Sequence, residues 1–167
     1  DDRCRNRFFR NTIDCISHRR YFEIGPGGSG TLSKLVLDSH PLNTLFAVEA
    51  VSSSVTKVTA RLRQYGERFR IVQGLAGLVP LPISAAPIDV VVAEILGHLA
   101  SNEGYISILH ACGRAYPHMA KSIKIAVPSV FGTHMVPVDL SAALSLRIAA
   151  IGPRVTLIYK LPFAEVQ

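Results

Sequence analysis

The chain has 167 residues, of which 49% are hydrophobic and 18% are charged, and its formal net charge is +6. This length suggests one domain, or one domain with part of another, and the apolar content excludes an intrinsically disordered chain. No apolar run reaches the roughly 18 residues needed to span a bilayer, so no membrane partner is expected. The polar start, DDRCRNRFFRN, does not have the pattern of a secretory signal.

The cysteines indicate the redox state of the compartment, and the basic residues bear on whether the chain binds nucleic acid. Cys4, Cys15 and Cys112 are odd in number and show no CxxC spacing, which favours a reduced compartment and disfavours zinc. We therefore expect a cytoplasmic or nuclear protein. The basic residues are scattered rather than gathered in a run with interleaved aromatics, so a nucleic-acid partner is not favoured.

Apolar runs alternate with amphipathic stretches along most of the chain. In chain order the pattern predicts a strand at 20–25, a helix at 29–40, a strand at 44–50, a helix at 52–66, a strand at 69–74, a proline-broken loop, a strand at 88–96, a helix at 104–116 and a strand at 122–131. Serines at the start of 52–66 are candidate N-caps. Such alternation predicts a parallel α/β sheet, which binds ligands at the carboxyl ends of its strands.

The pattern changes at Pro128. The segments that follow are short and strand-like, and they could begin an antiparallel module. About forty residues are too few to close a sandwich or barrel of ordinary size. We therefore expect a first domain at 1–127 and an incomplete second module at 128–167.

A glycine-rich turn and an acidic residue mark a candidate nucleotide site. Gly25, Gly27 and Gly30 lie in EIGPGGSGTLS, between a predicted strand and a predicted helix. Glycines let the backbone approach a ligand closely, and the helix N-terminus presents unpaired N–H groups. Glu49 ends the next strand, where a carboxylate can accept hydrogen bonds from ribose hydroxyls. NAD and S-adenosylmethionine both carry adenosine, and this pattern does not separate them.

Two glutamates, Glu94 and Glu103, lie nine positions apart, and Gly97 and Gly104 would allow the loop between them to fold back. Paired carboxylates suit acid/base catalysis, as in glycosidases, or the grip of one cation, and a planar guanidinium pairs with carboxylates bidentately. Since an uncompensated charge at the end of an apolar strand is costly, we favour the cation. In the alternative reading, Glu94 caps a helix and Glu103 is solvated. No metal-like His/Asp set accompanies the pair.

The segment Glu94–Glu103 resembles the double-glutamate loop of the protein arginine methyltransferases. Its Glu-Ile-Leu-Gly opening and Asn-Glu close are most similar to the symmetric-dimethylating, type II branch. Residues 2–13 resemble the N-terminal helix of the family, residues 46–49 its ribose-binding strand, and Pro128 the proline before its β-barrel.

The resemblance implies a Rossmann-like, S-adenosylmethionine-dependent α/β methyltransferase fold with the beginning of a C-terminal β-barrel. It implies methyl transfer to arginine guanidino nitrogens of proteins such as histones or Arg/Gly-rich proteins, by a homo- or hetero-oligomer. Glu94 and Glu103 are the implied catalytic residues. The implied cofactor-binding residues are Arg5, which would bind the carboxylate, Gly25, Gly27, Gly30, Glu49, Ala76 through its backbone N–H, and Glu94.

The chain also departs from the family. Its glycine turn is one residue longer than GxGxG, and the glutamate that contacts the adenine amino group is replaced near Ala76 and Gly77. An RNA methyltransferase is an alternative, suggested by the EIGPG start, although Glu-Ile-Leu-Gly stands where those enzymes carry an Asn-Leu-Pro-Tyr-like motif. A non-catalytic, methyltransferase-like partner subunit is a second alternative, and a nicotinamide-dependent oxidoreductase is a weaker third.

Overall fold

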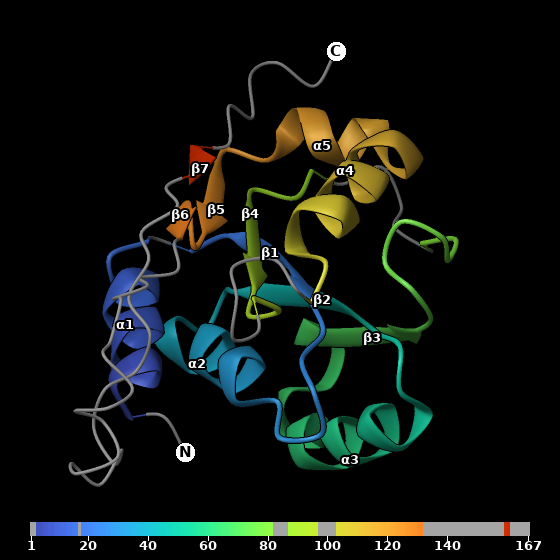
Figure 1. Ribbon diagram of the computed structural model, residues 1–167. Coiled ribbons are helices and arrows are strands. Elements are labelled where there is room, and N and C mark those ends of the chain that lie inside the picture. The colour runs from blue at the N-terminus through green and yellow to red at the C-terminus, as the bar shows by residue number, and fades with distance from the viewer. Residues whose placement is uncertain (1–2, 17, 82–86, 97–102, 132–158, 161–167) are drawn as a thin grey trace, which may run out of the picture.

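The computed structural model describes residues 3–16, 18–81, 87–96, 103–131 and 159–160. A central sheet carries helices on both faces (Figure 1). The strands of this sheet are β1 (Arg20–Ile24), β2 (Thr44–Glu49), β3 (Phe69–Gln73), β4 (Val90–Ala93) and β5 (Ile125–Val127). The helices are α1 (Arg3–Asp14), α2 (Thr31–Ser39), α3 (Ser52–Leu62), the 3₁₀ helix η1 (Arg63–Arg68), α4 (Tyr105–Ala115) and α5 (Pro117–Ser122).

All pairings in the sheet are parallel, and the strand order is β3-β2-β1-β4-β5. The chain moves outward from β1 to β3 and then returns to place β4 on the other side of β1. This reversal makes the carboxyl ends of β1 and β4 a topological switch point, where ligands bind in open α/β sheets. Ile24 is in register with both Val48 and Ala93. Gly25, Glu49 and Glu94 therefore lie at the carboxyl ends of three neighbouring strands.

The two faces of the sheet carry separate apolar clusters. Tyr21 packs with α1, α2 and α3, whereas its neighbour Phe22 packs with α4 and α5. The same alternation separates Val90 from Val91. Because successive side chains of a strand point to opposite faces, a continuous apolar run serves both clusters. The predicted parallel α/β architecture is confirmed.

The fifth strand predicted at 122–131 is present but is much shorter than predicted. Pro117 occupies the first position of α5, where its missing N–H and fixed φ favour a helix, and this helix continues to Ser122. The strand β5 covers only Ile125–Val127 and stops before Pro128, which has no N–H to donate to the sheet.

Two other boundaries differ from expectation. The strand predicted at 88–96 covers only 90–93, so Glu94 lies directly after it. The helix α3 has Val51 as its N-cap without a side-chain cap, so the predicted serine caps are wrong. The helix predicted at 52–66 continues from Leu62 as η1.

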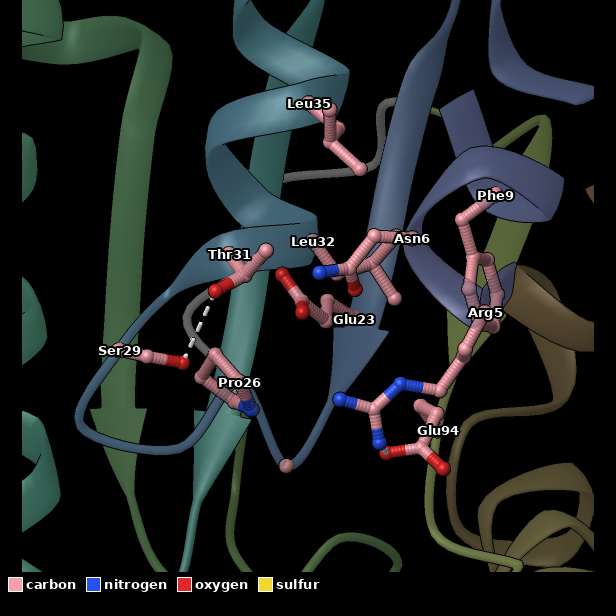
Figure 2. A pocket seen from close by; sticks show the side chains of 11 residues that line it. Arg5, Asn6, Phe9, Glu23, Pro26, Ser29, Thr31, Leu32, Leu35 and Glu94 are labelled. Atoms are coloured by element: carbon pink, nitrogen blue, oxygen red, sulfur yellow. Dashed lines mark hydrogen bonds and ion pairs between the residues drawn. The ribbon is translucent and has the colours of Figure 1, made fainter. Parts of the chain in front are cut away.

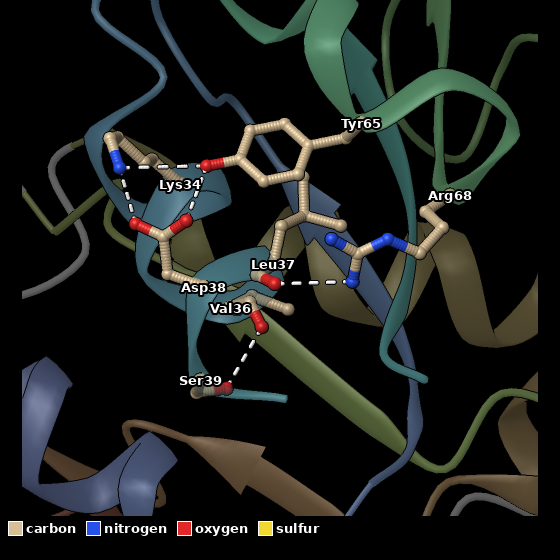
Figure 3. Close-up of polar contacts among 7 residues, drawn as sticks. All are labelled: Lys34, Val36, Leu37, Asp38, Ser39, Tyr65 and Arg68. Carbon is tan, nitrogen blue, oxygen red and sulfur yellow. Dashed lines mark hydrogen bonds and ion pairs between the residues drawn. The ribbon is translucent and has the colours of Figure 1, made fainter. Parts of the chain in front are cut away.

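Arg68 closes the carboxyl end of α2. Its Nη1 donates to the carbonyl oxygens of Leu37, His40 and Asn43 at 3.2, 3.1 and 3.3 Å, and its guanidinium lies over the Tyr65 ring. Figure 3 shows Arg68 directed at the Leu37 carbonyl. The last carbonyls of a helix have no partner within the helix, so this arginine satisfies acceptors that the fold leaves over.

Beyond β5, the strand β6 (Val130–Phe131) pairs antiparallel with β7 (Tyr159–Lys160). The other residues of the predicted β-barrel module lie outside the described part of the chain, and the division at residues 127 and 128 stays a prediction. Among the described residues, no helix has both the length and the apolar character needed to cross a membrane.

Candidate functional site

The glycine turn joins β1 to α2 with three left-handed residues. Gly25, Gly27 and Gly30 have φ values of 69°, 63° and 54°. A Cβ on Gly30 would lie 2.5 Å from Val58 Cγ2, so the start of α2 packs against α3 at a distance that only glycine permits. The turn predicted for these residues is therefore present, with the N-terminus of α2 directly behind it.

Glu49 holds this turn in place. The residue is 6% exposed. Its Oε2 accepts a hydrogen bond from the Gly27 N–H at 2.9 Å, and its Oε1 accepts one from the Val51 N–H at 2.8 Å. Two backbone amides compensate the buried charge and link the end of β2 to the glycine turn and to α3. Each carboxylate oxygen can accept more than one hydrogen bond, so a ribose hydroxyl can share this group.

A pocket opens beside the glycine turn, between α1, α2 and the end of β4 (Figure 2). Arg5 reaches into it from α1, and Arg5 Nη1 lies 2.9 Å from Glu94 Oε2. These side chains are 43% and 36% exposed. Residues 89 positions apart are thus brought together at the switch point. Both were predicted site residues, but their pairing was not predicted.

Glu23 lines the same pocket but was not among the predicted site residues. Its side chain lies between those of α1 and α2 in Figure 2, it is 1% exposed, and Ser33 Oγ donates to its Oε2 at 2.5 Å. Burial raises the pKa of Glu23 to about 8, the Ser33 hydrogen bond opposes this rise, and the charge of Glu49 adds to it. The available signal was a carboxylate inside the otherwise apolar run of β1.

The remaining predicted site residues, Ala76 and Glu103, lie in separate segments of the chain. Ala76 is partly buried in the turn after β3, next to Gly77. Glu103 is exposed and precedes Gly104, the N-cap of α4. Most of the segment between Glu94 and Glu103, residues 97–102, lies outside the described residues. The predicted convergence of the two glutamates therefore stays a prediction.

The pocket presents opposite charges to a ligand. Arg5 offers guanidinium donors, whereas Glu23 and Glu94 offer carboxyl groups, and Glu49 lies next along the strand edge. This combination suits a zwitterionic α-amino acid attached to a larger polar molecule. Within the described ranges, no cluster of three or more His, Cys, Asp or Glu residues could hold a metal ion.

No protein-family model and no curated protein matches the sequence. Solved structures do match. Protein arginine methyltransferase 10 of Arabidopsis thaliana aligns with a TM-score of 0.57 at 18% identity, over 68% of this chain and 32% of that one. A PRMT1 enzyme-prozyme heterotetramer of Trypanosoma brucei, solved with AdoHcy, aligns with a TM-score of 0.60 at 16% identity, over 75% of this chain and 39% of that one.

The chain thus spans about a third of the length of the first of these proteins and about two fifths of the second. At such identities the likeness establishes the fold alone. The chain has the Rossmann-like α/β sheet found in protein arginine methyltransferases.

Proposed function

We propose that the chain is the S-adenosylmethionine-binding part of a protein arginine methyltransferase. The observation that carries this proposal is the guanidinium of Arg5 bound to Glu94 at the switch point. Glu94 already pairs with a guanidinium group, which is the group that an arginine substrate carries. The double-glutamate resemblance and the fold point to the same chemistry.

The residues present fit the proposed cofactor. Arg5 would bind its carboxylate, Glu23 its ammonium group and Glu49 its ribose hydroxyls, while the glycine turn would allow close approach. Glu23 is well suited to an ammonium group because burial disfavours its negative charge until a cation arrives. Ala76 would contact the base through its backbone N–H. When bound, S-adenosylmethionine would supply a methyl group carried on a positively charged sulfur.

The glutamates would bring two cations together. A substrate guanidinium repels a sulfonium, and Glu94 and Glu103 would offset that repulsion while orienting the nitrogen that accepts the methyl group. At an effective dielectric of about 20, unit charges about 4 Å apart interact by about 4 kcal/mol before desolvation. Glutamates on the other guanidinium nitrogens would also draw positive charge toward themselves. Proton loss from the methylated nitrogen can follow the transfer.

Glu94→Gln and Glu103→Gln test these roles. Each should abolish transfer of a radiolabelled methyl group to histones and Arg/Gly-rich peptides while leaving S-adenosylhomocysteine binding measurable by calorimetry. Glu67→Gln is the control, because Glu67 is 89% exposed and pairs with Arg70 on the surface. Full activity in either test variant would refute the assignment. Mass spectrometry of the product tests the symmetric branch, which rests on the sequence of the loop alone.

A non-catalytic partner subunit is the second candidate. Both carboxylate oxygens of Glu49 already accept backbone hydrogen bonds, and the glycine turn has an additional residue. If these bonds keep ribose out, the chain will bind no S-adenosylhomocysteine in calorimetry. It would then act by stabilising a catalytic partner in a hetero-oligomer.

A further inference from the structure

The turn after β3, residues 76–78, lies at the end of the strand next to the proposed ribose site. The strand β3 is the next strand beyond β2 in the sheet, and the Gly74 N–H donates to the Glu49 carbonyl at 2.9 Å. If the amino-acid end of the cofactor lies beside β1 and the ribose beside β2, the base reaches the end of β3. This placement rests on the proposed function.

Tyr116 fastens this turn to the body of the protein. Its hydroxyl accepts a hydrogen bond from the Gly77 N–H at 2.9 Å and donates one to the Val79 carbonyl at 2.6 Å. Its ring meets Phe22 of β1 edge-on, with centroids 6.4 Å apart. One side chain anchored on the core therefore fixes two peptide groups of the turn.

The turn also packs tightly on α4. Gly77 is buried with a φ of 85°, and a Cβ there would lie 2.6 Å from Ala111 Cβ and 2.8 Å from the Ala111 backbone. The turn 76–78 thus lies between a helix that it touches closely and a hydroxyl that bonds to it. Its peptide groups have little freedom to shift relative to the end of β3.

We propose that Tyr116 is a positioning residue for base recognition. The Gly77 N–H donates to Tyr116 and the Leu78 N–H to the Leu75 carbonyl. Tyr116 thus holds the turn 76–78 in place, and the Ala76 peptide group reads the hydrogen-bonding edge of an adenine. Because the family glutamate is replaced near Ala76 and Gly77, the backbone of this turn has to supply the selectivity for the base. Such groups discriminate only when they are fixed in place.

The test compares two ligands in Tyr116→Phe and the wild type. S-adenosylhomocysteine presents an amino donor and a ring acceptor at the edge of its base, and S-inosylhomocysteine reverses both. By calorimetry, Tyr116→Phe should bind S-adenosylhomocysteine about 10-fold more weakly. The preference for adenosyl over inosyl should shrink as well. The kcat measured at saturating S-adenosylmethionine should remain near the wild-type value.

Tyr105→Phe is the matched control. Tyr105 is buried at the start of α4, whereas Tyr116 is half-buried and caps the end of that helix. The Tyr105 hydroxyl donates to the Pro128 carbonyl at 2.9 Å and not to the turn 76–78. Tyr105→Phe should lose comparable stability and keep the wild-type affinity and preference. An unchanged preference in Tyr116→Phe, or an equal loss in Tyr105→Phe, would overturn the proposal.

Hydrogen exchange gives a second measurement if Tyr116→Phe does not fold. The Gly77 amide of the wild type should be protected before any ligand is added, and rapid exchange there would contradict a fixed turn. If the wild type binds no S-adenosylhomocysteine, the proposed function fails, and this inference fails with it. Retained binding with an unchanged preference defeats the inference alone.

Discussion

Replacing Glu23 by glutamine perturbs the electrostatics of the pocket most selectively. The glutamine oxygen can still accept the Ser33 hydrogen bond, so packing and hydrogen bonding are largely kept while the titrating group is lost. In the wild type, burial raises the pKa of Glu23 from 4.5 to about 8. At neutral pH the folded chain therefore keeps a proton that the unfolded chain has released.

The sign of the effect follows from proton binding in the two states. Below pH 4.5 both states hold the proton, so Glu23 adds no pH dependence. Between pH 4.5 and about 8 only the folded state holds it. The free energy of unfolding then falls as pH rises, by about 1.4 kcal/mol per pH unit. Above about 8 neither state holds the proton and the loss levels off. The full loss is on the order of 5 kcal/mol, and about 3 kcal/mol of it is present at pH 7.

Urea unfolding between about pH 5 and about pH 9 measures this loss, because the midpoint and slope give the free energy of unfolding at each pH. The stability advantage of Glu23→Gln over the wild type should grow with pH and then level off. Subtracting the two profiles removes the contribution of the other titrating groups. Glu67→Gln, at an exposed position, should give a profile parallel to the wild type. A parallel profile for Glu23→Gln as well would refute the reasoning.

Three further outcomes are expected. If the ammonium group of S-adenosylhomocysteine binds beside Glu23, the Glu23 carboxyl should lose its proton on binding at pH 7. The heat of binding should then vary with the ionisation enthalpy of the buffer. A heat of binding that is the same in all buffers would argue against that contact. Tyr21→Phe should raise the free energy of unfolding by about 1 kcal/mol, because the buried Tyr21 hydroxyl has no hydrogen-bond partner in the described structure; a clear loss in urea titrations would count against this. Arg68→Ala should lower the free energy of unfolding by about 2 kcal/mol, because it leaves carbonyls at the end of α2 without their donor. Arg70→Ala removes only an exposed ion pair with Glu67 and should change the free energy of unfolding little. Equal effects of the two substitutions in thermal unfolding would contradict this difference.

The sequence predicted the first three strands to within one residue of their carboxyl ends. Each apolar run there is closed by a glycine or by a glutamate, and these signals are local. The pattern made the fifth strand too long at both ends. Ser122 belongs to α5, which Pro117 begins, and Pro128 ends β5, but the apolar residues at 122–131 resemble one continuous strand.

The site was less accessible to sequence reasoning. Glu49 and Glu94 could be proposed because they stand at strand ends, and Arg5 could be proposed because its segment resembles the N-terminal helix of the protein arginine methyltransferases. Their partners could not, because the Arg5–Glu94 contact depends on where α1 packs relative to β4. Glu23 was missed because periodicity assigns a residue to a face of a strand but does not identify the cavity that this face lines.

Calorimetric titration of S-adenosylhomocysteine into the chain tests the central claim most directly, with Arg5→Ala and Glu49→Ala measured beside the wild type. The account predicts one binding site in the wild type and at least about 10-fold weaker binding in each variant, since each removes a charged hydrogen-bonding partner of the ligand. Unchanged affinity in both variants, or no heat of binding in the wild type, would contradict it.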